Sequence, residues 1–544
     1  MKELKKTLGW FFRQTRGYHS AFWGICLTGI LRICAQLGFV WILKRLVDIA
    51  TGRSDSSLYL SIGLMVVILL CQLSFSALTY RQREIIRVKL GNHLRSVLFS
   101  SVMRSQWMGR EKLHTGDTMD RLEEDVRVVS QLYCDQLPAI VMVGFQLLAA
   151  SAFLYVLQPA LLLILLFIMP VALVMSKLFF KITRRITGQI RQNDSEVQSH
   201  VQEHLQNRTL VLTMGQTELI ENQLDTLQGE GLNLNLKRLS FNVRSRFFVQ
   251  LGFMTGYSVA FIWGILGLMA GTVTYGMLTA FLQLVNQIQR PIVDLSQYLP
   301  HLIQSYTSIE RLKELAVLPQ EEQAEEHRLS GPVGIRIENL TYSYPDAENA
   351  TLQQLSYDFE PCTSTAIVGE TGAGKSTLMR LMLALLKPDA GSITLYDKEV
   401  SLPASVSTRC NFMYVPQGNS LISGTVRENL LLGNPEATDE EMTQALHLAA
   451  ADFILERPEG LDTPCSEKGA GLSEGQAQRI AIARALLQPG NILVLDEASS
   501  ALDEETERQI LHNLSQQSTL DRKTIIWITH HAQVSQYMER CLQL

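Results

Sequence analysis

The apolar residues of this chain are unevenly placed, with long uncharged runs before about residue 300 and few after it. A helix that crosses the hydrocarbon core of a bilayer needs about 20 mostly apolar residues. Six stretches satisfy this requirement, at 21–43, 58–80, 137–157, 160–180, 247–271 and from Tyr275 to beyond Pro291. The pattern therefore predicts six membrane helices followed by a soluble half.

Basic residues between these stretches predict how the chain is oriented. The connections 81–136 and 181–246 carry ten and nine lysines and arginines, whereas the opposite connections carry only Lys44, Arg45 and Arg53. Basic connections stay in the cytoplasm, so we place both long connections, the N-terminus and the soluble half there. Apolar residues at helical spacing in both connections predict helices that extend well beyond the membrane.

The two ends of the membrane half predict the domain limits. Trp10, Phe11 and Phe12 among lysines and arginines favour a helix in the membrane interface over residues 1–18, the alternative being a solvated tail. The transmembrane domain then covers 19–315, a polar linker 316–332 and the soluble domain 333–544.

Composition adds little to this division. The 47% of hydrophobic residues is near the soluble average, so the chain cannot be all membrane span. A net charge of −5 gives no reason to expect nucleic acid as a partner. The eight cysteines form no CxxC pair, which argues against a zinc site.

The first functional motif of the soluble half is a predicted phosphate-binding loop. A strand-like run leads into a Gly-x4-Gly-Lys-Ser segment, whose backbone N–H groups and following helix favour phosphate. Lys375 is expected to hold the terminal phosphates of ATP and Ser376 to bind Mg²⁺. The expected contacts are Gly369, Glu370, Thr371, Gly372, Ala373, Gly374, Lys375, Ser376 and Thr377.

A second acidic motif, NILVLDEASSALD, follows further along the chain. The apolar run 492–495 predicts a buried strand that ends in Asp496 and Glu497. An aspartate there can hold Mg²⁺ through water, and the adjacent glutamate can polarise the attacking water. A solvated strand end is the alternative, and the upstream phosphate loop argues against it.

The segment LSEGQ at 472–476 resembles the signature motif of ABC transporters. The resemblance implies ATP contacts by the Ser473 hydroxyl and the Gly475 N–H, with Gln476 beside them. The usual motif has glycine where this chain has Glu474. We expect that carboxylate to point outward, and the departure leaves the rate of hydrolysis open but not its existence.

Other residues fall where that family has nucleotide contacts. Tyr344 resembles the aromatic residue that stacks on adenine, and His530 resembles the switch histidine at the γ-phosphate. Gln417 resembles the lid glutamine that touches Mg²⁺. Asp503 resembles the loop that crosses to the partner domain.

The resemblance covers the membrane contacts as well. Glu467 is similar to the acidic residue that contacts the membrane domain, and 116–126 to its first coupling loop. His531 is expected to be a surface residue. Asp48, Pro291 and the pair Glu310–Arg311 also sit where the family often has such residues.

The resemblance implies a fold and an activity. The fold is an all-α six-helix transmembrane bundle with long cytoplasmic extensions, followed by an α/β P-loop NTPase domain with a helical signature subdomain. The cofactors are ATP and Mg²⁺. Because phosphate loop and signature lie on opposite edges of this domain, a second copy, or a related half-transporter, completes each site. The implied function is ATP-driven export by alternating access.

The cargo remains open between lipids, peptides and amphiphilic small molecules. Polar side chains within the spans predict a partly polar path with positive charge, or merely hydrogen bonds between helices; they are Arg32, Gln36, Gln146, Gln283, Asn286, Gln287 and Arg290. Import, or a regulatory or channel role, are the alternative functions. Six spans exclude a soluble DNA-repair ATPase. Short external connections suggest a multi-pass protein of a bacterial inner membrane.

Overall fold

The chain divides into two compact units. The computed structural model describes residues 2–107, 115–177, 180–322, 324–344, 349–370, 372–465, 471–498, 501–516, 523–530 and 536–544. The helical unit comprises Met1–Met103 and Thr115–Val317, and the α/β unit comprises Arg104–His114 and Leu318–Leu544. The assignment of Arg104–His114 to the α/β unit has no counterpart in the sequence-based division, whose limits remain predictions.

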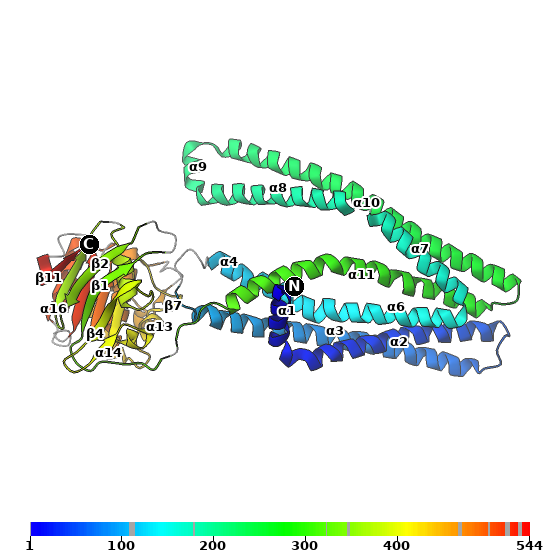
Figure 1. Cartoon of the computed structure of the whole chain (residues 1–544), viewed down its shortest axis with the longest axis horizontal. Helices are drawn as coiled ribbons and strands as arrows, with labels where there is room; N and C mark the ends of the chain where they lie inside the picture. Colours follow the sequence, from blue (N-terminus) through cyan, green and yellow to red (C-terminus); the bar gives the residue numbers. More distant parts are fainter. Residues whose placement is uncertain are drawn as a thin grey trace. The chain divides into compact units, whose positions relative to one another are not determined.

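The described residues of the helical unit contain long helices joined by short connections (Figure 1). The elements are α1 (Lys2–Gln14), η1 (Arg16–Tyr18), α2 (His19–Ala50), α3 (Leu58–Met103), α4 (Thr115–Asp120), η2 (Arg121–Asp125), α5 (Val126–Gln131), η3 (Leu132–Gln136), α6 (Leu137–Leu157), α7 (Pro159–Lys177), α8 (Phe180–Gln206), α9 (Arg208–Met214), α10 (Thr217–Met269) and α11 (Tyr275–Ala316). Helix α1 lies across the long axes of α2 and α3.

Helix length confirms the predicted extensions beyond the membrane. Helix α10 has 53 residues and α3 has 46. At about 1.5 Å per residue α10 is about 80 Å long, against about 30 Å for the hydrocarbon core. More than half of α10 is therefore available outside the bilayer.

Four of the six predicted spans lie in helical segments that are long and apolar enough to cross a membrane, as judged from the described residues: Arg16–Ala50, Leu58–Met103, Gly116–Leu157 and Thr217–Met269. The fourth predicted span lies in α7, whose described apolar stretch is the shorter Pro159–Ile168. The sixth lies in α11, which is helical throughout but too polar to meet that criterion, because glutamines, an asparagine and an arginine interrupt its apolar residues.

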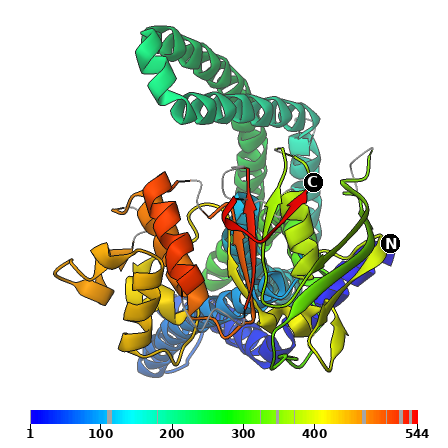
Figure 2. The ribbon, with the colours of Figure 1, turned by 90° about the vertical axis from the view of Figure 1, so that its left-hand side faces the viewer.

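Helices α8, α9 and α10 form a hairpin that reaches away from α2, α3 and α6 (Figures 1 and 2). On α10 the apolar side chains Leu232, Leu236, Leu239 and Val243 are all more than half exposed. Their spacing of four, three and four residues places them on one helical face. Asparagines, a lysine and an arginine lie between them, together with Leu234, Ser240 and Phe241, and all four precede the predicted span 247–271.

The segment 116–126, predicted as a coupling loop, is helical and is tied to α11. Arg311 lies 2.8 Å from the carboxylate of Asp117 and 3.1 Å from that of Asp125. Arg121 lies 2.8 Å from the Glu314 carboxylate. The expected loop is therefore part of the helical unit, and the residues directly before it belong to the α/β unit.

The described part of the α/β unit holds three sheets. Parallel strands in the order β11-β3-β10-β9-β6 form the central sheet, an antiparallel sheet has the order β2-β1-β4-β5, and β7 pairs with β8. The strands are β1 (Gly334–Tyr342), β2 (Leu352–Phe359), β3 (Ser364–Val368), β4 (Ala390–Tyr396), β5 (Ser401–Pro403), β6 (Phe412–Val415), β7 (Gly424–Thr425), β8 (Pro464–Cys465), β9 (Ile492–Asp496), β10 (Thr524–Thr529) and β11 (Arg540–Gln543).

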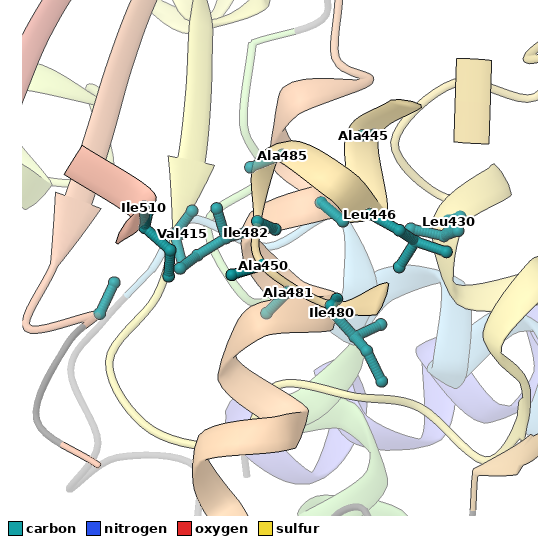
Figure 3. Packing of buried hydrophobic residues seen from close by; sticks show 14 of the residues in the cluster. Val415, Leu430, Ala445, Leu446, Ala450, Ile480, Ala481, Ile482, Ala485 and Ile510 are labelled. Atoms are coloured by element: carbon teal, nitrogen blue, oxygen red, sulfur yellow. The ribbon is translucent and has the colours of Figure 1, made fainter. Parts of the chain in front are cut away.

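The helices of this unit are α12 (Lys375–Met382), α13 (Val426–Leu431), α14 (Asp439–Leu448), α15 (Glu474–Leu486) and α16 (Glu504–Gln516), with short 3-10 turns at η4 (Val406–Asn411), η5 (Asp452–Ile454) and η6 (Gly460–Asp462). Side chains of α12 pack in one core with β1, β2 and β4. Those of α13, α14 and α15 pack in another, around Ile480, Ala481 and Ile482 (Figure 3). The phosphate-loop helix and the signature helix therefore rest on separate cores.

Candidate functional site

Four adjacent parallel strands bring the predicted catalytic segments to one edge of the sheet. The phosphate loop follows β3, His530 follows β10, Asp496 ends β9 and Gln417 lies just after β6. All pairings between these strands are parallel, so their carboxyl ends point the same way. Ligands of open α/β sheets bind outside these ends.

The phosphate loop turns sharply into α12 at Gly374. This residue has φ 97°, which side chains other than glycine rarely adopt, and a Cβ there would meet Leu352 Cδ2 at 2.9 Å. Lys375, buried, donates from Nζ to the carbonyl oxygens of Gly369 (2.7 Å) and Glu370 (3.0 Å). The ammonium thus lies against the loop that is expected to hold phosphate. Thr371, a predicted contact, lies outside the described residues.

The aromatic residue predicted to stack on adenine lies beside this helix. The Tyr344 hydroxyl is 3.2 Å from Thr377 Oγ1, and Arg380 Nη1 donates to it at 3.1 Å. The sequence reasoning missed Arg380. A usable signal was its place on α12, one turn beyond Ser376 and Thr377 and therefore on the same side of the helix.

The acidic pair at the end of β9 occupies two environments. Asp496 is buried, and burial together with the neighbouring Glu497 charge raises the pKa of its carboxyl to about 6, against opposing effects of Arg380, Tyr414 and Lys375. Glu497 has φ 47°, an uncommon conformation for a non-glycine residue. Its Oε2 accepts a hydrogen bond from Gln417 Nε2 at 2.6 Å. The structure thus brings two of the predicted catalytic side chains into contact.

The donor set fits a magnesium ion. Asp496 Oδ1 is buried and has no hydrogen-bond partner among the described residues. A buried carboxylate oxygen of this kind is costly unless a cation or water satisfies it. Ser376, in the first turn of α12, and Gln417 supply the further oxygen atoms that Mg²⁺ prefers. His530 is exposed at the end of β10.

The predicted signature residues are engaged within their own helix. Ser473 caps α15: its hydroxyl accepts from the Gln476 N–H at 3.2 Å, and the Gln476 side chain accepts from the Ser473 N–H at 3.1 Å. A Cβ on Gly475 would meet the Ala501 carbonyl oxygen at 2.6 Å. Glu474 is exposed in the first turn of this helix.

Asp503 plays a similar local part at α16. Its carboxylate accepts from the Thr506 N–H and from the Thr506 hydroxyl, both at 2.9 Å. These hydrogen bonds hold the pKa of Asp503 below its usual value. Glu467 and His531 lie outside the described residues.

The polar side chains predicted within the spans differ in burial and in whether they have hydrogen-bond partners. On α11, Gln287 is buried and its Oε1 has no partner among the described residues, whereas Asn286 and Arg290 are exposed. Arg32 of α2 has a buried Nε without a hydrogen-bond partner within the described part. Arg83 of α3, which the sequence reasoning did not single out, shares this property.

Two sequence models of protein families match the chain. The model described as ABC transporter transmembrane region matches residues 22–292, and the one described as ABC transporter matches residues 352–500. These two matches cover the helical bundle and most of the phosphate-loop and acidic-pair site.

Curated relatives extend this similarity over the chain. The ATP-dependent lipid A-core flippase of Pseudomonas fluorescens is 30% identical over 82% of this chain and 74% of its own length. ATP-binding cassette sub-family B member 10, mitochondrial, of Mus musculus is 28% identical over 97% of this chain and 75% of its own length. Several other relatives are longer, and the chain spans about a third to a half of their length.

A solved structure has the same fold. The structure of a bacterial Atm1-family ABC exporter with ATP bound matches 97% of this chain and 93% of its own, with a TM-score of 0.79 and 23% identity.

Proposed function

The chain belongs to the ABC transporter family, and we propose that it hydrolyses ATP to export a lipid, a peptide or an amphiphilic small molecule across a membrane. The observation that carries the proposal is the convergence of four predicted catalytic segments at the carboxyl ends of β3, β10, β9 and β6. A fold alone hosts many activities, whereas this set of side chains suits one reaction.

Each of these residues has a distinct task in the proposed hydrolysis. Lys375 and the N–H groups of the loop hold the β- and γ-phosphates, and Tyr344 stacks on adenine. Ser376, Gln417 and Asp496, the last through water, hold Mg²⁺, which neutralises phosphate charge when bound. Glu497 orients and polarises the attacking water.

His530 contacts the γ-phosphate in this proposal. Gln417 donates to Glu497 Oε2 at 2.6 Å, and we propose that loosening of this hydrogen bond leaves the whole carboxylate available to the water. Movement of the segment that carries Gln417 is thus proposed to favour hydrolysis.

A second copy of the chain, or a related half-transporter, completes the machine in this proposal. The stripe Leu232, Leu236, Leu239 and Val243 is exposed on the part of α10 that lies outside the predicted span. Leaving four such side chains in water is unfavourable by about 1.5–3 kcal/mol each relative to full burial. The second copy covers this stripe, and its Ser473, Gly475, Gln476 and Asp503 close over the nucleotide of the first.

The charge inside the bundle bears on the cargo. Arg32, within the first predicted span, lies within ion-pair distance of no carboxylate among the described residues, and its buried Nε has no hydrogen-bond partner there. Charged groups at membrane depth face a cavity or a partner. This favours amphiphilic cargo with an anionic group. Measured stimulation of ATP hydrolysis in liposomes by anionic amphiphiles, but not by neutral ones of equal chain length, checks it.

Location and direction complete the proposal. Basic residues on the long connections support an N-terminus and an ATP-binding unit in the cytoplasm, and short opposite connections support a bacterial inner membrane. Import, or a regulatory or channel-like role, is the alternative. Transport into inside-out vesicles distinguishes them, since only an exporter fills these vesicles when ATP is added outside.

The decisive test is Glu497→Gln. We expect this variant to bind ATP with at least wild-type affinity and to lose at least about 100-fold in turnover, the usual contribution of a positioned base. Steady-state phosphate release and nucleotide retention after gel filtration measure the two effects. Glu399→Gln, at an exposed glutamate of the same unit, is the matched control. Normal turnover in the Glu497 variant would refute the assignment.

A further inference from the structure

The connection between α3 and α4 enters the α/β unit as a short strand-like segment. Ser105 forms an isolated antiparallel bridge with Gln320. The Gln106 N–H donates to the Pro319 carbonyl at 2.8 Å, and the Glu321 N–H donates to the Arg104 carbonyl at 2.9 Å. These backbone hydrogen bonds fasten residues 104–106 to the linker that follows α11.

The linker is in turn anchored at the end of the phosphate-loop helix. The Glu321 carboxylate accepts two hydrogen bonds from Arg409, at 3.0 and 3.1 Å. The same guanidinium donates to the carbonyl oxygens of Leu383 (3.0 Å) and Ala384 (3.2 Å), directly after α12. A bidentate pair with further carbonyl bonds fixes orientation as well as distance. The segment 104–107 is therefore held in register with α12.

Trp107, the next residue, reaches α12 itself. The guanidinium of Arg380 lies over the Trp107 ring, 4.6 Å from its centroid. That guanidinium also donates to the Tyr344 hydroxyl at 3.1 Å, which is 3.2 Å from Thr377 Oγ1 in the first turn of α12. A continuous set of contacts thus runs from the α3–α4 connection to the proposed adenine contact.

Trp107 also borders a cavity. The cavity has a volume of about 470 Å³ and is lined by Trp107, Glu321, Leu385, Pro388 and Val406 among others. A ring beside open space can shift with the backbone that carries it, whereas a ring in a dense core cannot. The stacking on Arg380 is a specific contact that limits such movement of the ring.

We propose that Trp107 is a positioning residue for nucleotide binding: through Arg380 it holds Tyr344, so that the α3–α4 connection sets the affinity of the site for ATP. The proposal rests on the proposed function, because it concerns the same ATP site. Residues 104–107 are continuous in the chain with α3, which carries the second predicted span. Displacement of that helix changes the Trp107–Arg380 contact, and with it the position of Tyr344 and the affinity for ATP.

The test uses the full-length chain with Glu497→Gln, so that ATP is not consumed, and titrates a fluorescent ATP analogue. A cation–π contact of this exposure corresponds to about a two- to fivefold change in an equilibrium constant. Trp107→Leu keeps an apolar side chain without a π face, and we expect its Kd to rise about threefold. Trp107→Phe keeps an aromatic face over Arg380, and we expect its Kd to stay within about 1.5-fold of the Kd of the Glu497→Gln parent.

Arg336→Ala is the matched control, because Arg336 lies over the Tyr396 ring at 4.7 Å in the same unit; its Kd stays at the parent value. In the hydrolysing chain, Trp107→Leu raises KM for ATP with kcat unchanged. An unchanged Kd in Trp107→Leu, or an equal rise in Trp107→Phe, overturns the inference. Absence of nucleotide binding in the Glu497→Gln parent overturns the proposed function instead. Thermal unfolding of each variant separates loss of fold from loss of contact.

Discussion

The two sets of predicted ATP contacts differ in what their side chains already do. At the strand ends, groups from different elements contact one another: Gln417 bonds Glu497, and Tyr344 bonds Thr377 and Arg380. At the signature, Ser473 and Asp503 bond only the first turns of their own helices among the described partners. The strand-end set is assembled within one chain, whereas the signature set presents capped helix ends, as is expected if a second copy completes the site.

Replacing the phosphate-loop lysine, which belongs to the strand-end set, is expected to have the largest effect on ATP binding. Lys375→Met should weaken ATP binding about 100-fold, because charge-assisted hydrogen bonds to phosphate contribute about 1.5–3 kcal/mol each. Titration with a fluorescent ATP analogue measures it. Lys387→Met, at an exposed lysine just after α12, is the control. Comparable affinity in the two variants would contradict the assignment of the loop.

The substitution Gly475→Ala tests whether the strand-end set and the signature set act independently. The added Cβ would meet the Ala501 carbonyl at 2.6 Å, so we expect Gly475→Ala to reduce the free energy of unfolding by about 1–3 kcal/mol and to reduce turnover. ATP binding at the strand ends should be retained.

Chemical denaturation and ATP titration of the same sample measure both effects of Gly475→Ala. Gly331→Ala is the control, because a Cβ there has only an ordinary contact at 3.9 Å. Loss of ATP affinity in proportion to turnover would show that the two sets are not independent.

The unusual glutamate of the signature gives the smallest expected effect. Glu474 is exposed in the first turn of α15, where a negative charge stabilises the helix by about 0.3–1 kcal/mol. Glu474→Gln should therefore lower the melting temperature slightly and change turnover less than about twofold. Calorimetry and phosphate release measure this. A severalfold rise in turnover would show that the carboxylate faces a phosphate.

The sequence predicted the strand-end set well because its parts follow local rules. A strand, a glycine turn and a helix start are encoded within a few residues around Gly374, and the apolar run before Asp496 marks a buried strand. The roles of these residues remain predictions. The hydrogen bond between Gln417 and Glu497 could be expected only from the resemblance. It depends on β6 lying beside β9 in the sheet, which the spacing of residues along the chain does not reveal.

Long-range contacts were beyond local reasoning. Nothing near Trp107 in the sequence points to Arg380, which lies more than 250 residues away, and Tyr414, on the neighbouring strand β6, interacts with Asp496. Segment 116–126 was expected to be a coupling loop from the resemblance alone; it is helical, and Arg311 on α11 pairs with its Asp117 and Asp125. Helix α11 is also less apolar than the other predicted spans. A membrane helix can carry polar side chains on a face that it turns toward other helices or a cavity.

The assignment of Arg104–His114 to the α/β unit has a consequence for how the protein is made. The rest of that unit begins at Leu318, so the ribosome must synthesise roughly two hundred further residues, on the order of 10–40 s at about 5–20 residues per second, before this segment meets its neighbours. The contacts of residues 104–107 with the linker and with Arg380 therefore cannot form until those later residues have been synthesised. A fragment expressed from residue 318 onward lacks the Trp107 cover of Arg380 and is expected to hold nucleotide less tightly than the intact chain.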